Sequence, residues 1–424
     1  MAPRYDLVLK GGSVATPAGL AEADIGVRSG RIVAIGPING PAGEILDVRG
    51  LTVLPGVIDS QVHFREPGLE HKEDLASGSR AAVMGGVTAV FEMPNTKPLT
   101  TTAEAVADKI RRASGRMYCD FAFWVGATAQ NIEQIPELER LPGTAGIKIF
   151  MGSSTGDLLV ADDETLTRVL SKTRRRVAVH AEDESRLEAR KPLREPGNPL
   201  SHPVWRDAEA ALLATRRLVT IARATGARVH VLHVSTAEEM AFLIDHKDVA
   251  SIEVTPHHLT LATDEHGRRL GTRMQMNPPV RDSSVRAALW RALDGGLVDV
   301  LGSDHAPHTL EEKAKAYPDS PSGMTGVQTL VPIMLDHLAR GRLTLARFID
   351  LTSAGPARLF GITTKGRIAL GYDADFTVVD LKRQHIINND WIASKAAWTP
   401  YHGQIVTGWP VGTIIRGRRA MWEG

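Results

Sequence analysis

Cysteine is almost absent from this chain of 424 residues, since Cys119 is the only one. A single cysteine can form neither an internal disulfide nor a cysteine-based zinc finger, so the sequence favours a reducing compartment. Long apolar runs are lacking too: nothing approaches the roughly 20 residues of a membrane span, and the first residues contain no run of signal-peptide type. We therefore expect a cytoplasmic protein that does not insert into a membrane.

An excess of charge of one sign is also missing. Lysine and arginine number 50 and aspartate and glutamate 49, which gives a net charge of +1. This balance argues against a nucleic-acid groove or an anionic membrane surface as the main partner. Hydrophobic residues make up 43% and charged residues 23%, as in ordinary globular proteins. At this length we expect two or three domains, or one large α/β barrel with attachments.

Both ends of the chain have a sequence pattern typical of short strands joined by glycine-containing turns. This pattern covers residues 1–54 and returns over residues 366–424. Strands with one covered face need partners, so we predict that the two ends form one small β-sandwich domain. The sequence between them, residues 55–365, is predicted to be a separate barrel.

That middle part alternates apolar runs with helical patterns such as residues 208–226, which end at Gly226. Continuous apolar character with many β-branched residues is typical of parallel strands that are buried on both faces. Eight such units over about 310 residues predict an α/β fold of the (β/α)₈ TIM-barrel class. The eight runs are residues 56–64, 87–94, 121–128, 146–152, 176–182, 228–235, 252–258 and 298–308.

Five polar residues stand within these runs, each after an apolar segment. They are His63, Lys148, His180, His233 and Asp304. On a barrel they would lie at the carboxyl ends of different strands, where such barrels build their active sites. Several imidazoles with a carboxylate suit zinc or a similar ion, so the sequence predicts a metal site.

Each of these residues also has an ordinary structural interpretation. A single histidine after a strand is usually a hydrogen-bonded core or surface residue, and Asp304 could cap the helix that follows it. Lys148 stands in the apolar run GIKIF, where a lysine must snorkel or be neutralised. Reaction of its amine with carbon dioxide would give an anionic metal ligand, but spacing alone does not demonstrate it.

A second group of polar residues lies beside the first in the sequence: Arg65, Asn95, Asn277 and His308. A guanidinium with amide and imidazole donors beside a metal site is typical of a carboxylate clamp, because guanidinium binds carboxylate with two parallel hydrogen bonds. The alternative is that Arg65 forms a structural ion pair with Glu66 or Glu92.

The sequence resembles the dihydroorotases of the amidohydrolase superfamily over nearly its whole length. The resemblance is carried by the ordered motifs PGVIDSQVHFREPG, AAVMGGVTAVFEMPNT, GIKIFMGSSTG, VHAEDES, VHVLHVSTAEE, TPHHL, MNPPVR, SDHAPHTLEEK and WTPYHG. It implies a metal-containing barrel that interconverts dihydroorotate and N-carbamoyl-L-aspartate in pyrimidine biosynthesis. It also implies that His63 and Asp304 bind one metal, that His180 and His233 bind the other, and that Lys148 bridges them as a carbamate.

The same resemblance implies roles for the second group. Arg65, Asn95 and His308 would hold the substrate carboxylate and Asn277 its ring, and SSTG at residues 153–156 corresponds to the family's mobile substrate loop. One or two Zn²⁺ ions per chain and a homodimer or higher oligomer are expected.

The resemblance also implies the chemistry: a metal-held hydroxide attacks the ring amide, while Asp304 takes the water proton and delivers it to the leaving nitrogen. One position departs from the family pattern, because Gln61 stands where the family has the first histidine of His-x-His. A glutamine amide is a weaker zinc ligand than imidazole, so one metal site is expected to be weakened.

Two alternatives to a dihydroorotase follow. One is another cyclic amidase, acting on a hydantoin, a dihydropyrimidine or allantoin; Arg65 and Asn95 speak against it, because neutral rings need no carboxylate clamp. The other is a non-catalytic homologue that partners an aspartate carbamoyltransferase. The remaining predicted ligands and the clamp are chemically intact, which speaks against this second alternative.

Overall fold

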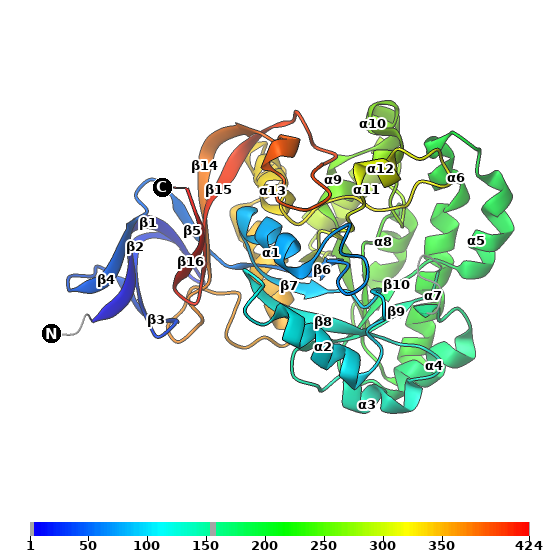
Figure 1. Cartoon of the computed structure of the whole chain (residues 1–424), viewed down its shortest axis with the longest axis horizontal. Helices are drawn as coiled ribbons and strands as arrows, with labels where there is room; N and C mark the ends of the chain where they lie inside the picture. The colour runs from blue at the N-terminus through cyan, green and yellow to red at the C-terminus, as the bar shows by residue number, and fades with distance from the viewer. Residues whose placement is uncertain (1–3, 153–157, 424) are drawn as a thin grey trace.

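Eight parallel strands in the middle of the chain form a closed barrel (Figure 1). In the computed structural model, which describes residues 4–152 and 158–423, they pair in chain order, and a parallel bridge between Val62 and His305 joins the first strand to the segment that follows the last. The strands are β6 (Val57–Val62), β7 (Val87–Glu92), β8 (Asp120–Gly126), β9 (Thr144–Phe150), β10 (Val177–His180), β11 (Val229–Val231), β12 (Ala250–Val254) and β13 (Val300–Leu301).

Each of the eight apolar runs overlaps one of these strands, and nearly all strand residues are buried. Burial on both faces explains why the sequence shows continuous apolar runs rather than alternation. All the predicted runs extend beyond the ends of their strands, those at 228–235, 252–258 and 298–308 the furthest. The strand at 252–258 ends at Val254, because Thr255 caps helix α9 (Pro256–Thr260) and Pro256 starts it. The strand within 298–308 covers two residues only, and the chain then runs along the barrel rim.

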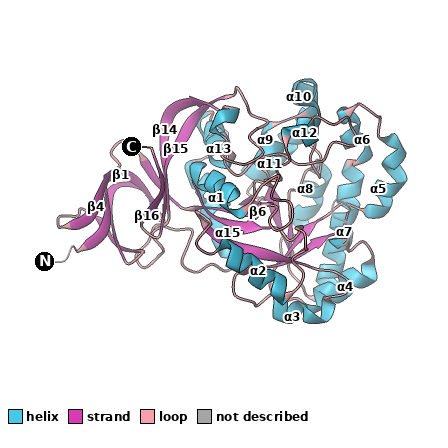
Figure 2. Ribbon diagram, in the orientation of Figure 1, coloured by secondary structure: helices cyan, strands magenta, loops and turns pink. Residues whose placement is uncertain are grey.

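Helices cover the outside of the barrel (Figure 2). The longest, α7 (Ala208–Thr225), confirms the helix expected over 208–226: the Asp207 side chain accepts from the amide of Ala210, and Gly226 ends the helix with a φ of 72°. The others are α1 (Leu75–Met84), α2 (Ala103–Ala113), α3 (Ile135–Leu138), α4 (Asp163–Lys172), α5 (Glu184–Arg190), α6 (His202–Trp205), α8 (Ala237–Leu243), α10 (Thr263–Leu270), α11 (Ser283–Asp294), α12 (Leu310–Lys313), α13 (Leu330–Ala339), α14 (Leu345–Ile349) and α15 (Gly355–Leu359).

The two ends of the chain meet in a second eight-stranded sheet beside the barrel (Figure 1). Its order is β16-β15-β14-β5-β1-β2-β3, with β4 paired to β1, and the antiparallel pair of β5 and β14 joins the N-terminal strands to the C-terminal ones. The predicted fold class, a TIM-type barrel with a β domain from both termini, is confirmed. The strands are β1 (Tyr5–Thr16), β2 (Gly19–Arg28), β3 (Arg31–Gly36), β4 (Ala42–Asp47), β5 (Thr52–Pro55), β14 (Phe376–Ile386), β15 (Ile405–Ile415) and β16 (Arg418–Trp422).

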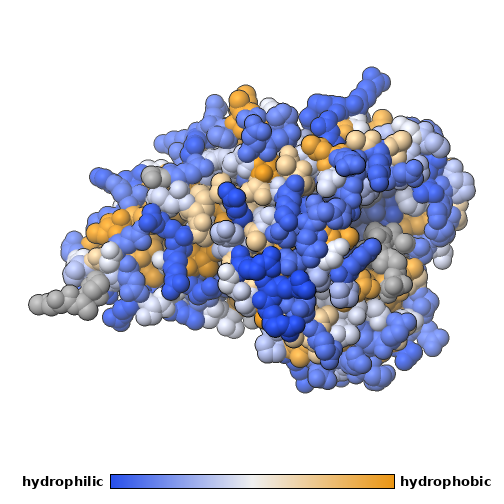
Figure 3. Space-filling model, viewed as in Figure 1, coloured by the Kyte–Doolittle hydropathy of each residue, from blue (hydrophilic) through white to orange (hydrophobic). Residues whose placement is uncertain are grey.

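On the face drawn in Figure 3, hydrophilic residues predominate and apolar residues form small patches. Across the described ranges, no helix combines the length and the apolar character needed to cross a membrane.

Candidate active site

A cavity of about 350 Å³ opens at the carboxyl ends of the barrel strands. Parallel strands end at the same rim, so residues far apart in the sequence converge there. All the predicted site residues line this cavity. They are Gln61, His63, Arg65, Asn95, Lys148, His180, His233, Asn277, Asp304 and His308. The SSTG segment at 153–156 lies outside the described residues.

Lys148, in β9, is a buried amine without a hydrogen-bond partner among the described residues. Its Nζ lies 4.3 Å from the centre of the Phe150 ring, and burial lowers the pKa of the amine to about 7. Because desolvation disfavours the ammonium, much of this lysine is a neutral amine near pH 7. A neutral amine is the form that reacts with carbon dioxide.

His180, the last residue of β10, and His233, two residues after the end of β11, lie against each other. The distance between His180 Nδ1 and His233 Nε2 is 3.1 Å, and His233 Nδ1 has no partner in the described part of the chain. Burial holds the pKa of both imidazoles below the usual value. Neutral imidazole is the form that binds metal ions.

Glu182 orients His180 and was not predicted from the sequence. Its Oε2 lies 2.9 Å from His180 Nε2 and 2.5 Å from the guanidinium of Arg206. The side chains of Glu182 and Arg206 are both buried. The arginine and the imidazole lower the pKa of Glu182 against the opposing effect of burial. The carboxylate thereby fixes the His180 ring with Nδ1 toward the cavity. In the sequence, this role is indicated by the position of Glu182, two residues after His180 in the motif VHAEDES.

Asp304 is held by the two residues from β6 and the rim that follows it. Gln61 Nε2 donates to Asp304 Oδ1 at 3.0 Å, and His63 Nε2 lies 3.3 Å from the same oxygen. His63 Nδ1 in turn contacts Asn95 Oδ1 at 2.6 Å. The Asn95 amide oxygen therefore faces His63, and the NH₂ group of Asn95 is left to face the cavity. Gln61 binds the carboxylate here through its nitrogen, while its Oε1 is buried without a partner among the described residues.

Arg65 and His308 form the opposite wall of the cavity. Arg65 Nε donates to the carbonyl of Pro307 at 3.2 Å, and a terminal nitrogen lies 3.3 Å from His308 Nε2. Burial lowers the pKa of Arg65 to about 10, so it is still charged at neutral pH. Within the described chain it forms no ion pair with a carboxylate, and a buried positive charge of this kind favours an anionic ligand.

Asn277 is oriented by a residue that the sequence analysis missed. His202 Nε2 lies 2.9 Å from Asn277 Oδ1 and also 2.9 Å from the carbonyl of Met276. Because a carbonyl only accepts, Nε2 carries the proton, and the Asn277 NH₂ group is the part left for a ligand. His202 is the first residue of α6, between β10 and α7, and its local sequence does not predict this contact.

Two ordinary interpretations of these residues are wrong. Asp304 caps no helix: it has a φ of 46°, and the next helix, α12, is capped by Thr309. The expected partners of Arg65 are also occupied elsewhere.

Glu66 pairs with Arg116 at 2.8 Å and Glu92 with Lys109. The structural ion pair with Arg65 is therefore not formed, since both carboxylates have other cations closer to them.

The donor set fits a divalent metal. Lys148 Nζ and His233 Nδ1 are buried polar atoms without partners, beside the imidazole of His180. Within residues 4–152 and 158–423, no group of three or more His, Cys, Asp or Glu side chains is arranged to hold a metal ion.

Comparison with known proteins agrees with this geometry. Residues 52–420 match the amidohydrolase family. The chain belongs to the amidohydrolase family.

Among its relatives is a dihydroorotase of Methanothermobacter thermautotrophicus, 37% identical over 406 residues that cover 95% of this chain and 91% of the relative. An allantoinase of Rubrobacter xylanophilus is 36% identical over 441 residues, covering 99% and 95%. The L-hydantoinase structure from Arthrobacter aurescens superposes with a TM-score of 0.95 at 30% identity, covering 99% of this chain and 97% of that one. This amidohydrolase is therefore an enzyme of the cyclic amidohydrolase group.

Proposed function

We propose that this amidohydrolase is a dihydroorotase, which interconverts dihydroorotate and N-carbamoyl-L-aspartate in pyrimidine biosynthesis. The observation that carries the proposal is Arg65, a buried guanidinium that lines the cavity and has no carboxylate partner among the described residues. Dihydroorotate brings a carboxylate to that charge. The relatives named dihydroorotase support the same choice.

The side chains around the cavity suggest a division of work. Arg65 and the NH₂ group of Asn95 face the substrate carboxylate, with His308 beside them, and the NH₂ group of Asn277 faces the ring. Asp304 accepts the proton of the attacking water and passes it to the ring nitrogen as the amide bond breaks. Its two described contacts both reach Oδ1, which leaves Oδ2 for this transfer.

We further propose that a divalent metal, Zn²⁺ at one or two ions per chain, is held by His180, His233 and a carbamylated Lys148, with His63 and Asp304 as the second set. A bound metal would polarise the ring carbonyl and lower the pKa of water toward neutrality. Gln61 contacts Asp304 through its nitrogen, so it supports that carboxylate rather than supplying a donor of its own.

A second candidate function is hydrolysis of a neutral ring, as in allantoinases or hydantoinases. The allantoinase relative and the superposed L-hydantoinase favour it. The buried charge of Arg65 speaks against it, because a neutral ring would leave that guanidinium without a counter-ion.

The test is a matched pair of substrates. Dihydroorotate and dihydrouracil share the same ring and differ in the carboxylate, so the ratio of their kcat/KM values isolates the contribution of that group. We expect dihydroorotate to be preferred by about ten- to a hundredfold, as one charged hydrogen bond contributes roughly 1.5–3 kcal/mol. Equal turnover of both, or faster turnover of allantoin or hydantoin, would replace the proposal by the second candidate.

The proposal also covers the localisation and the assembly of the enzyme. We propose a cytoplasmic enzyme that forms a homodimer or higher oligomer, alone or with an aspartate carbamoyltransferase. Light scattering of the purified chain, with and without that partner, tests both assemblies. The domain limits, 1–54 with 366–424 and 55–365, are likewise proposed and are testable by limited proteolysis.

A further inference from the structure

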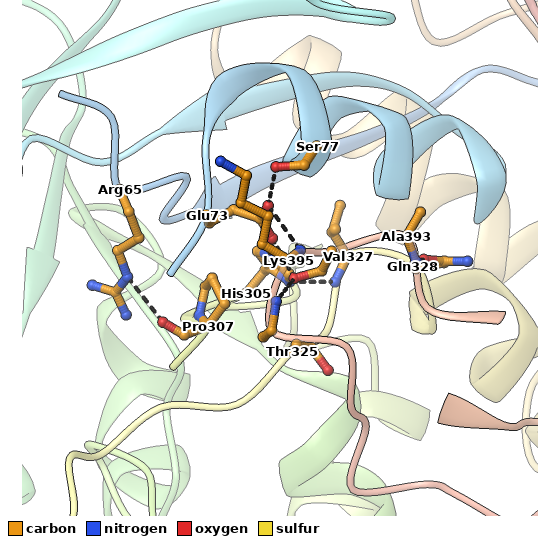
Figure 4. A network of polar contacts seen from close by, with 12 residues as sticks. Arg65, Glu73, Ser77, His305, Pro307, Thr325, Val327, Gln328, Ala393 and Lys395 are labelled. Atoms are coloured by element: carbon orange, nitrogen blue, oxygen red, sulfur yellow. Dashed lines mark hydrogen bonds and ion pairs between the residues drawn. The ribbon is translucent and has the colours of Figure 1, made fainter. Parts of the chain in front are cut away.

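A short segment after β14, residues 391–398, crosses from the β domain to the barrel rim; we call it the strap. The backbone amide of Lys395 donates to Glu73 Oε1 at 3.2 Å, and the Ser394 hydroxyl donates to Glu73 Oε2. Glu73 lies just before α1, and the Ser77 hydroxyl of that helix also donates to it. Figure 4 shows Glu73 between α1, the strap and the His305 ring.

His305 is the fourth partner of Glu73. Its Nε2 lies 3.3 Å from Glu73 Oε2, and both side chains are almost completely buried. On the other side of the ring, Nδ1 accepts from the backbone amide of Gly326 at 3.1 Å. A backbone N–H can only donate, so the ring proton resides on Nε2 and points at the carboxylate. Both ring nitrogens are thus fixed by opposite neighbours.

Neither His305 nor Glu73 lines the cavity, yet His305 directly follows Asp304. Asp304 has a φ of 46°, a conformation that costs a non-glycine residue free energy and persists only where neighbours enforce it. The backbone beside it is held by the His305 carbonyl, which accepts from the amide of His63 at 2.7 Å. Anchoring of the His305 ring therefore fixes one side of this strained residue.

We propose that Glu73 and His305 are positioning residues for Asp304. The strap and α1 hold Glu73, Glu73 and Gly326 hold the His305 ring, and the ring holds the backbone that aims the Asp304 carboxylate at Gln61 and His63. The β domain thereby contributes to the active site without touching the substrate. The inference builds on the proposed function only where turnover is the readout.

The first test compares His305→Leu with His305→Gln. Leucine removes both ring contacts, whereas a glutamine amide keeps a donor for Glu73. We expect kcat on dihydroorotate to fall on the order of tenfold to a hundredfold in His305→Leu, since a misplacement of about 1 Å costs this much, while KM changes little. His305→Gln should recover a large part of the loss. Because Asp304 is a proposed ligand of the second metal set, the metal count of His305→Leu should fall by at most one ion per chain, and His305→Gln should keep the wild-type count.

A matched control separates positioning from general destabilisation. Val219→Ala truncates a buried side chain of α7, a helix none of whose residues lines the cavity. It should lower the melting temperature yet keep kcat. If Val219→Ala and His305→Leu lower kcat alike, or if both His305 variants keep wild-type kcat, the inference is overturned. Should His305→Leu fail to fold, His305→Gln and Ser394→Ala carry the same comparison.

A crystal structure of His305→Leu gives a readout that does not need turnover. We expect Asp304 to leave its positive φ, or its Oδ1 to move away from Gln61 Nε2, now at 3.0 Å. An unchanged Asp304 in the variant overturns the inference even if the enzyme proves inactive on every cyclic amide. An inactive wild-type protein with a displaced Asp304 in the variant would instead refute the proposed function alone.

Discussion

Replacement of Arg65 by lysine tests the carboxylate clamp most directly. In the structure the guanidinium divides its nitrogens: Nε donates to the carbonyl of Pro307, one terminal nitrogen contacts His308, and the other terminal nitrogen has no described partner. A lysine has a single nitrogen and must choose between the rim carbonyl and the substrate. The charge is kept in Arg65→Lys, but the two parallel hydrogen bonds to a carboxylate are lost.

The magnitude follows from the number of bonds lost. One charge-assisted hydrogen bond contributes roughly 1.5–3 kcal/mol, which corresponds to about a ten- to hundredfold lower kcat/KM for dihydroorotate. Loss of the bond to Pro307 destabilises the fold by about 1 kcal/mol, so the melting temperature should change by a few degrees at most. The metal content should not change, because no predicted metal ligand is altered.

The assay measures kcat/KM of wild type and Arg65→Lys on dihydroorotate and on dihydrouracil. If the clamp is real, the variant loses its preference for the carboxylated ring while its rate on dihydrouracil is kept. Wild-type activity of the lysine variant on dihydroorotate, or an equal loss on both rings, would refute the reasoning. Metal counting by mass spectrometry and a thermal melt exclude a trivial loss of folding.

Three further predictions concern other residues. Asp304→Asn should lower kcat by about 10²–10⁴, since a general acid–base group is lost, while the metal count changes by at most one per chain; activity above a few per cent contradicts the role. Gln61→His should raise metal bound after dialysis toward two ions per chain, and an unchanged count means that the site works with its present set. Lys109→Met should destabilise the fold by about 3–5 kcal/mol, because the Glu92 carboxylate remains buried without its partner. Burial raises the Glu92 pKa from 4.5 to about 7, so the folded state favours the protonated acid and the loss in Lys109→Met should be larger at pH 8 than at pH 5, as chemical unfolding at both pH values will show.

The sequence by itself determined the barrel and the rim residues. Strands buried on both faces are mainly apolar, and a polar residue near the carboxyl end of such a strand lies at or near the shared rim, so His63, Lys148, His180 and His233 follow from local pattern. The helix over 208–226 was readable for the same reason, since its cap and its terminal glycine are local signals.

Only the tertiary structure decided which side chains meet. Gln61 and Asp304 are 243 positions apart in the chain, and Glu73 and Ser394 are 321 apart. Periodicity reports the environment of one residue and not the identity of its partner. From the sequence alone, Arg65 could have paired with Glu66 or Glu92. In the folded chain both carboxylates pair with other cations, so the Arg65 guanidinium is charged, buried and lines the cavity. Such pairings depend on how the rim loops pack against one another, and that packing is a property of the whole folded chain.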